Sequence, residues 1–224
     1  MLEPKLDILP TAQKTLWEKL NTTPAHFVLY GGTALTLRLG HRSSVDFDFF
    51  SSHSFSPEEL QKQIPYLYGT QRIQSEPNTL TCLVQLREEP IKISFFGGLG
   101  LARVGHPQRT SDNGIWVASL LDLAATKLKV VQDRAEARDY LDLARIIEEN
   151  VSLSEMIQAA MGAYGSAFNP MISLRALTFF QDGDLPDLDP EIQTSLREAV
   201  SGIDLEALQP MPRTGIKLEG EEGA

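Results

Sequence analysis

The residues best suited to chemistry are two aspartates, Asp46 and Asp48, in the run HRSSVDFDFF. The alternation of Asp with Phe predicts a β-strand, and alternate residues of a strand point to the same face of a sheet. Both carboxylates therefore lie on one face, about 7 Å apart along the strand, and Phe47, Phe49 and Phe50 are expected to bury the other face. Mg²⁺ takes one or two carboxylates and completes its shell with water and substrate phosphates. The pair predicts a divalent-metal site for phosphate chemistry.

A strand, a glycine pair and a helix are expected shortly before these acids. The apolar run HFVLY ends at Gly31-Gly32, and TALTLRL follows with the helical spacing of apolar residues. Glycine lets a backbone approach a triphosphate closely, and the N–H groups at a helix start favour anions. Alone, a glycine pair is more often a tight turn. Followed by Asp46 and Asp48, it predicts a nucleotide site beside the metal.

A second constellation lies in the later part of the chain. SLLDLAATKLKVV and EARDYLDLARII each have apolar residues three and four apart, and the polar stretch QDRAE separates them. This pattern predicts two helices joined by a turn near Asp133. An antiparallel hairpin would bring Lys127 level with Asp139 and Asp142, which share a helix face. The group is either part of a catalytic site or a structural ion pair.

Together these motifs resemble a known family. GG-T-A-L followed by H-R-x-S-x-D-x-D-F-F is similar to the nucleotidyltransferase core of the polymerase β superfamily, most closely to the AbiEii/AbiGii-type toxins. The stretch AATKLKVVQDRAEARDYLDLARII resembles the later motif of that family, and the resemblance covers about residues 26 to 149.

The resemblance implies a role for each matching position. The nucleotide-binding residues would be Gly31, Gly32, Thr33, Ser44 and Lys127; the metal ligands would be Asp46 and Asp48; the catalytic residues would be Asp46, Asp48, Lys127, Asp139 and Asp142. The implied cofactor is Mg²⁺ or Mn²⁺, with an NTP as substrate.

One position departs from the family pattern. Superfamily catalysts usually carry a third carboxylate on a neighbouring strand, and relatives often read Lys-Ile-Asp where this chain has Lys92-Ile93-Ser94. Serine supplies no negative charge, so the departure indicates a one-metal mechanism, another base, or a weakened catalyst. Asp139 or Asp142 is an alternative source of the acid. For Lys92, we expect the solvent side of its strand rather than the phosphates.

Composition sets broader limits. The chain has 224 residues, 42% of them hydrophobic, and a formal net charge of -10. Eleven of its 30 acidic residues, but only three of its 20 basic residues, lie from Gln181 onward, so the acidity belongs mainly to the end of the chain. A local basic patch for RNA therefore remains open, as do ordinary solvated helix charges. Its candidate members are Lys127, Lys129, Arg134, Arg138 and Arg145 on the helices, with Arg103, His106 and Arg109 in a loop.

The chain is expected to be a cytoplasmic protein with no membrane partner. No stretch approaches 18 apolar residues, and MLEPKLDILPTAQ has acids and prolines where a signal peptide would have a basic start and an apolar core. The single cysteine, Cys82, lies in the alternating run TLTCLVQL and is expected to be a small core residue.

We predict an α+β fold: a small mixed β-sheet nucleotidyltransferase core with packed helices, followed by a helical C-terminal half. LPTAQKTLWEKL is the expected first helix; TLTCLVQL and IKISFF add two strands to those ending at Tyr30 and Phe50. The glycine-rich stretch from residue 97 to residue 114 marks the boundary. The expected domains are residues 1–110 (core), 111–204 (helical) and 205–224, a tail that is frayed or laid on the surface.

The predicted function is metal-dependent transfer of a nucleoside monophosphate from a Mg²⁺-bound NTP to an acceptor. By resemblance the acceptor is RNA, perhaps tRNA, and the protein is the toxin of a toxin–antitoxin system with a separate antitoxin partner. The alternatives are a small-molecule nucleotidyltransferase and, because of Ser94, a non-catalytic nucleotide-binding protein.

Overall fold

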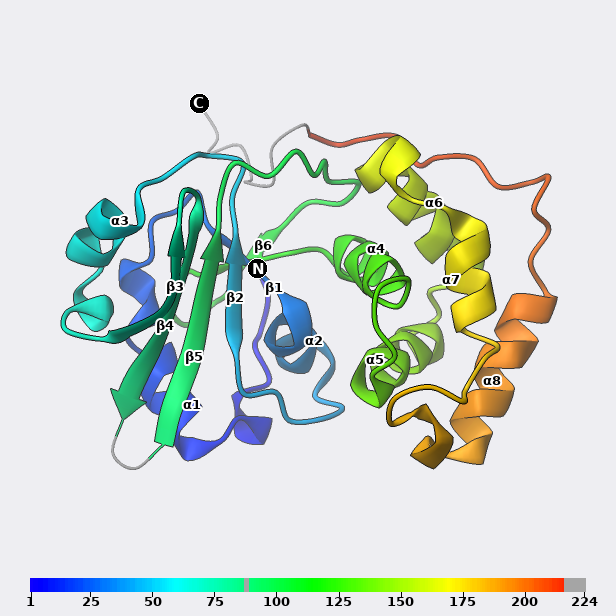
Figure 1. The fold of residues 1–224 in the computed structure, drawn as a ribbon, viewed down its shortest axis with the longest axis horizontal. Coiled ribbons are helices and arrows are strands. Elements are labelled where there is room, and N and C mark those ends of the chain that lie inside the picture. Colours follow the sequence, from blue (N-terminus) through cyan, green and yellow to red (C-terminus); the bar gives the residue numbers. More distant parts are fainter. Residues whose placement is uncertain (87–88, 216–224) are drawn as a thin grey trace. The chain divides into compact units, whose positions relative to one another are not determined.

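The computed structural model describes residues 1–86 and 89–215, which form two compact units. The first contains Met1–Leu101 and His106–Ser119; the second contains Ala102–Gly105 and Leu120–Thr214. Figure 1 shows strands and helices in the first unit and helices in the second, which confirms the predicted α+β class.

The helices of the first unit are short. They are η1 (Leu6–Ile8), α1 (Thr11–Trp17), η2 (Leu20–Thr22), α2 (Gly31–Leu39), α3 (Pro57–Gln63) and η3 (Pro65–Leu67). The strands are β1 (Val28–Tyr30), β2 (Phe47–Phe50), β3 (Gln71–Glu76), β4 (Thr79–Leu86), β5 (Glu89–Phe96), β6 (Gln108–Arg109) and β7 (Trp116–Val117).

Within the described residues, seven strands form one mixed sheet in the order β3-β4-β5-β2-β1-β7-β6. Strand β2 is central: it pairs antiparallel with β1 and parallel with β5. Helix α2 packs against β1 and β2, and Figure 1 shows it beside these strands. The mixed sheet was predicted, but β3, β6 and β7 were not among its expected strands.

The core of the first unit lies on the aromatic face of β2. Phe47 and Phe49 are completely buried. The ring of Phe47 stacks on Trp17 of α1 at a centroid distance of 6.3 Å, and the ring of Phe49 stacks on Phe95 of β5 at 5.3 Å. Cys82 is also buried, as predicted. This packing fixes which face of β2 points to the core.

The second unit consists of helices packed on one another. They are α4 (Leu120–Val130), α5 (Ala137–Glu148), α6 (Leu153–Tyr164), η4 (Gly165–Ala167), α7 (Pro170–Ala176), η5 (Leu185–Asp187) and α8 (Pro190–Ser201). Helix α4 contacts both α5 and α6, and α5 also contacts α8. The predicted hairpin of two helices is present as α4 and α5, with the turn at residues 131–136.

The end of the chain includes the predicted tail, residues 205–224. Its described part is bound along α6, since the Met211 N–H donates to the carbonyl of Gln158 and Arg213 donates to the carbonyl of Gly162. Residues 216–224 of this tail lie outside the described residues. The predicted division at residues 110 and 204 stays a prediction.

Candidate active site

The two aspartates of the first motif lie on one face of the sheet, as their spacing predicted. Along β2 the residues alternate between buried Phe and half-buried positions, so Asp48 points away from the core, and Asp46 directly precedes the strand. One part of the prediction was wrong. Phe50 lies on the aspartate face, because it is two residues from Asp48, and its ring stacks on Tyr30 at 4.7 Å.

The glycine pair begins helix α2 and touches the second aspartate. Gly31 has a φ of +73°, in the left-handed region that favours glycine. A Cβ atom there would lie 2.7 Å from Oδ2 of Asp48, closer than real contacts allow. Glycine is therefore required at position 31 for two reasons: the turn into α2 has a left-handed φ, and a side chain would collide with the Asp48 carboxylate.

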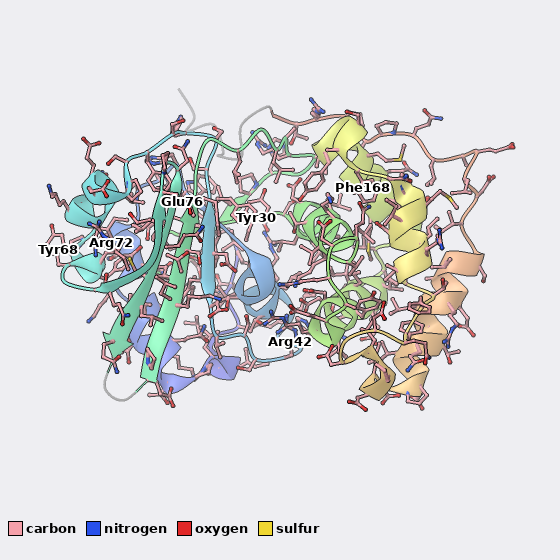
Figure 2. The ribbon with its side chains drawn as sticks, viewed as in Figure 1. Tyr30, Arg42, Tyr68, Arg72, Glu76 and Phe168 are labelled. Carbon is pink, nitrogen blue, oxygen red and sulfur yellow. The ribbon has the colours of Figure 1, made fainter. Side chains whose placement is uncertain are left out.

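The second glycine makes a similar close approach. A Cβ atom at Gly32 would lie 2.8 Å from Oγ of Ser44 and 3.0 Å from a guanidinium nitrogen of Arg42. Arg42 is labelled in Figure 2 and belongs to the loop between α2 and β2. The helix start, a serine hydroxyl, an arginine and Asp48 thus surround the glycine pair.

Two threonines of α2 hold this loop in place. The Thr33 hydroxyl donates to the main-chain carbonyl of Asp46 and lies 3.0 Å from Oγ of Ser44. The Thr36 hydroxyl lies 3.0 Å from the carbonyls of both Gly32 and Arg42. Thr33 is 1% exposed, so in this structure it positions the aspartate backbone. Its predicted contact with a nucleotide stays a prediction.

The neighbouring strand β5 brings two more side chains to the aspartates. In the parallel pairing of β2 with β5, Asp48 lies opposite Ser94, so the serine stands beside the acid pair where the family pattern has its third carboxylate. Ser94 is buried, and its Oγ lies 3.4 Å from Oγ1 of Thr81 on β4.

Lys92 lies on the same face as Ser94, because the two are two residues apart on one strand. Its ammonium is 2.8 Å from Oδ2 of Asp46. The expectation that Lys92 merely faces solvent was wrong, although 43% of its side chain is exposed. If the pairing of β5 with β2 had been known, the two-residue period of a strand would have placed Lys92, like Ser94, on the face of the acids.

The carboxylate pair fits one hard divalent cation. Asp46 and Asp48 supply oxygen ligands from one face, and Mg²⁺ is typically held by one or two carboxylates with water and phosphate oxygens. Over residues 1–86 and 89–215, no three His, Cys, Asp or Glu side chains gather as a metal site. Two carboxylates are a donor set typical of a Mg²⁺ ion whose other ligands are water and substrate oxygens.

The predicted residues Lys127, Asp139 and Asp142 form a cluster within the second unit. The Lys127 ammonium lies 2.6 Å from Oδ1 of Asp139 and 2.6 Å from Oδ2 of Asp142. Arg134, in the turn before α5, adds a bond from Nε to Oδ2 of Asp139 at 2.8 Å. Both carboxylates are completely buried and the lysine side chain is 8% exposed. The hairpin does bring the lysine level with the acids.

The charges in this cluster stabilise one another. Burial by itself raises the pKa of Asp139, but the hydrogen bond from Arg134 and the charge of Lys127 outweigh burial and hold that pKa below its ordinary value. A buried carboxylate needs such partners, because an unpaired buried charge is costly. The contact of Arg134 with Asp139 was not predicted from the sequence; the position of Arg134 in the hairpin turn is the signal that could have indicated it.

The arginines and lysines considered for RNA binding have carboxylate or protein partners instead. Lys129 pairs with Asp133, Arg138 with Glu136, and Arg145 with Glu148 and Glu149. The loop candidate Arg103 is 3% exposed. Ordinary i,i+3 and i,i+4 pairing on helices explains most of these contacts. The predicted helical cations are thus arranged as ion pairs, which favours the interpretation as ordinary helix charges.

The described part of the chain has no helix long and apolar enough to cross a membrane.

Comparison with known proteins adds independent findings. Residues 15–211 match the model of a family described as nucleotidyl transferase AbiEii toxin, type IV toxin–antitoxin system. An uncharacterised protein of Aquifex aeolicus (strain VF5) is 30% identical over 159 residues, which cover 70% of this chain and 74% of the relative.

Two solved structures are similar. The nucleotidyltransferase toxin MenT4 of Mycobacterium tuberculosis has 16% identity and a TM-score of 0.57, over 87% of this chain and 83% of the toxin. An antigenic nucleotidyltransferase-like protein of Paracoccidioides brasiliensis has 15% identity and a TM-score of 0.46, over 93% and 99% of the two chains. The similarity to MenT4 is a similarity of fold.

Proposed function

Because this chain belongs to the AbiEii nucleotidyl transferase toxin family of type IV toxin–antitoxin systems, we propose that it transfers a nucleoside monophosphate from an NTP to RNA, with tRNA as the first acceptor to test. The observation that carries the proposal is that Asp46, directly before β2, and Asp48, within β2, lie on one face of the sheet, with Asp48 against the glycine pair that begins α2.

The proposed reaction breaks a phosphoanhydride bond of the NTP and forms a phosphodiester bond to the acceptor. An acceptor hydroxyl oxygen bonds to the α-phosphorus of the NTP, the bond from that phosphorus to the bridging oxygen breaks, and pyrophosphate leaves. The hydroxyl proton passes to water. Bound Mg²⁺ would neutralise the charge that develops on the phosphate oxygens. The protein contributes mainly positioning and electrostatics.

Asp46 and Asp48 would hold the metal, and the start of α2 would hold the triphosphate. Gly31 and Gly32 are the first residues of α2, and the N–H groups at the start of a helix favour an anion. Gly31 and Gly32 keep this end of the helix without side-chain bulk. Ser44 lies against Gly32 and supplies a hydroxyl beside the same turn.

For Lys127, Asp139 and Asp142 we keep the catalytic assignment as a proposal alongside a structural one. The contacts of this cluster favour at least a structural role: the lysine pairs with two buried acids of α5, with Arg134 as a further cation on Asp139, and thereby ties α4 to α5. A catalytic role additionally requires that a conservative variant of one of these residues keeps its fold but loses nucleotidyl transfer activity.

The direct test is transfer of each of the four radiolabelled NTPs to total RNA in the presence of Mg²⁺ or Mn²⁺. We expect label from one preferred NTP on a discrete RNA band, with release of pyrophosphate, and neither with Asp48→Asn. Label on RNA from the Asp48→Asn protein would contradict the proposal. A separate antitoxin protein, the partner expected for this family, should suppress the toxicity of the active chain on co-expression.

A second candidate rests on Ser94, which stands where the third acid is expected beside Asp48. With that acid missing, the chain could bind an NTP without turning it over. Calorimetry that detects NTP binding, together with no pyrophosphate release on any RNA or small-molecule acceptor, would favour this candidate. Pyrophosphate release with a small molecule alone would favour a small-molecule nucleotidyltransferase.

A further inference from the structure

A pocket of the first unit lies at the C-terminal end of β4, at a place that the proposed function does not use. Its volume is about 480 Å³, within the range of small-molecule binding sites. Its walls are formed by Lys19 after α1, by the segment from η3 to the start of β3, and by the last residues of β4. Polar side chains and aromatic rings thus meet at one edge of the sheet.

The end of β4 leaves main-chain hydrogen-bonding groups at this pocket. Strand β4 pairs with β5 as far as Leu86↔Glu89, but its pairing with β3 begins at Leu83↔Gln71. Within residues 1–86 and 89–215, no strand therefore pairs with the outer edge of Val84–Leu86, and these three residues line the pocket. Successive residues of an antiparallel strand direct their N–H and C=O groups to opposite edges, so at least one of the three presents both groups to this side.

Two tyrosines line the pocket in different ways. Tyr66 is 9% exposed, and its hydroxyl lies 2.7 Å from that of Thr23, which anchors the ring. Tyr68, labelled in Figure 2, is 61% exposed. The turn that carries both is held by Thr70, whose hydroxyl donates to the carbonyl of Leu67 at 2.8 Å. One ring is therefore fixed in the wall, and the other is accessible for stacking.

We propose that this pocket binds a nucleobase that carries a phosphorylated ribose, a ligand that the proposed function does not place here. A base stacks on an exposed aromatic ring such as that of Tyr68. Its polar edge carries neighbouring donors and acceptors, which match the main-chain groups of Val84–Leu86 and the side-chain amide of Gln71. Lys19 is exposed at the same pocket and supplies a cation for the phosphate.

The size of the uncovered edge favours a base over an added peptide strand. Strand addition depends on a row of main-chain hydrogen bonds, and only Val84–Leu86 are uncovered at this end of β4. A single base needs no more than one or two of these groups.

Two sources share this chemistry, a free nucleotide and a single-stranded RNA. Leu83 in the pocket wall pairs with Lys92 of β5, and Lys92 pairs with Asp46. Two interstrand steps of about 4.8 Å place Leu83 about 10 Å from the strand of the acids. A base of an RNA bound at the acid pair is within reach of the pocket, and this source alone rests on the proposed function.

The test locates binding by nuclear magnetic resonance on the whole ¹⁵N-labelled protein. AMP, CMP, GMP and UMP are titrated with a chelator present, so that a metal-dependent site contributes little. The amide signals of Gln71 and Val84–Leu86 report on the pocket, and those of Gly31 and Gly32 report on the surroundings of the acid pair. We expect at least one nucleotide to shift the first group.

Variants separate the ring from the charge. Tyr68→Leu should weaken binding of the preferred nucleotide about tenfold, the order expected for one stacked base, and Tyr68→Phe should restore it. Ile73→Ala is the matched control, since Ile73 is 54% exposed on β3 and lies outside the pocket. Lys19→Met should lower the affinity for the nucleotide to that for its nucleoside, whereas Lys62→Met, at an exposed lysine of α3, should not. Circular dichroism verifies that each variant is folded.

The source is decided with a short single-stranded homopolymer of the preferred base. Binding about tenfold tighter than that of the mononucleotide, with the same amides shifted, assigns the pocket to RNA, because neighbouring phosphates and bases add contacts. Equal affinity assigns it to a free nucleotide. Either result supports a nucleobase site.

The proposal is overturned if neither the nucleotides nor the RNA shift the pocket amides, or if Tyr68→Leu binds as tightly as the unmodified protein. Shifts of Val84–Leu86 that arise only with a capped peptide of alternating threonine and valine also overturn it, since the edge then accepts a strand. A Lys19→Met protein that still prefers the nucleotide to its nucleoside overturns the role of the lysine. Shifts confined to Gly31 and Gly32 overturn the pocket and leave the proposed function standing, whereas an occupied pocket in a protein without transfer activity has the opposite consequence.

Discussion

The acid pair of the first unit and the acid pair of the second unit have opposite surroundings. Asp46 is 28% exposed and pairs with Lys92, which is itself 43% exposed. Asp139 and Asp142 are completely buried, share Lys127, and Asp139 also binds Arg134. Solvent and ligands can reach the first pair, whereas the second is enclosed with its own cations. The same residue type is therefore accessible to solvent in one unit and buried among its own cations in the other.

The largest expected effect of a substitution is on transfer, at the exposed pair. Asp48→Asn should lower the rate of nucleotidyl transfer about a thousandfold, because metal-based charge stabilisation is worth several kcal/mol. The thermal midpoint should change little, since Asp48 is half-buried and outside the core. Rates with saturating Mg²⁺ and NTP check this. A variant that retains full turnover would sink the metal assignment.

The buried cluster should show the reverse behaviour. Lys127→Met leaves two buried carboxylates without their shared cation, and breaking a buried pair typically costs about 3 to 5 kcal/mol. Urea unfolding measures the loss.

Lys129→Met is the matched control for this substitution. Lys129 belongs to the same helix but pairs with the exposed Asp133, so its loss should cost about 0.5 kcal/mol or less. If the two lysine variants lose similar stability, the structural role of the cluster is wrong. If Lys127→Met is folded at low temperature yet inactive, the cluster also serves catalysis.

At the glycine pair, Gly31→Ala should damage both the fold and the site. A left-handed φ of +73° costs a residue with a Cβ about 1 to 2 kcal/mol, and the new atom would lie 2.7 Å from the Asp48 carboxylate. We expect about a hundredfold loss of transfer, the size associated with misplacement by about 1 Å.

Gly69→Ala separates these two effects. Gly69 has a φ of +70°, but no atom lies within 4 Å of its Cβ position. The control should therefore lose similar stability and keep its transfer rate. Equal loss of transfer in both variants would show that backbone strain, not crowding of Asp48, is the cause.

The smallest effect concerns pH. The pKa of Asp139 is lower in the folded protein than its ordinary value, so the unfolded chain binds more protons between these two values. The stabilisation is complete above the ordinary aspartate pKa of about 3.9, and it is lost as the pH falls through the folded value. Unfolding free energies from about pH 6 downward should show this acid slope, with a smaller slope in Asp139→Asn. Identical slopes would contradict the assignment.

Local patterns predicted a large part of both regions. The alternation VDFDFF placed Asp46 and Asp48 on one face, and the spacing in α4 and α5 predicted the hairpin that unites Lys127 with its acids. Strand β3 was missed because all six of its residues are exposed, so QRIQSE has no apolar alternation. Strands β6 and β7 have two residues each, too few for a period to appear.

The sequence by itself determined the orientation of the acids and the need for glycine at the start of α2, because both follow from periodicity and backbone sterics over a few residues. Only the tertiary structure decided what surrounds them. Strand β5 pairs with β2 across more than 40 intervening positions, from Phe47 to Ile93, and this pairing sets Ser94 beside Asp48 and Lys92 on Asp46. The packing of α4 against α5 likewise decided that Lys127 is buried between its two acids. Pairing between distant strands and enclosure by packed helices depend on the whole chain, so no short pattern contains them.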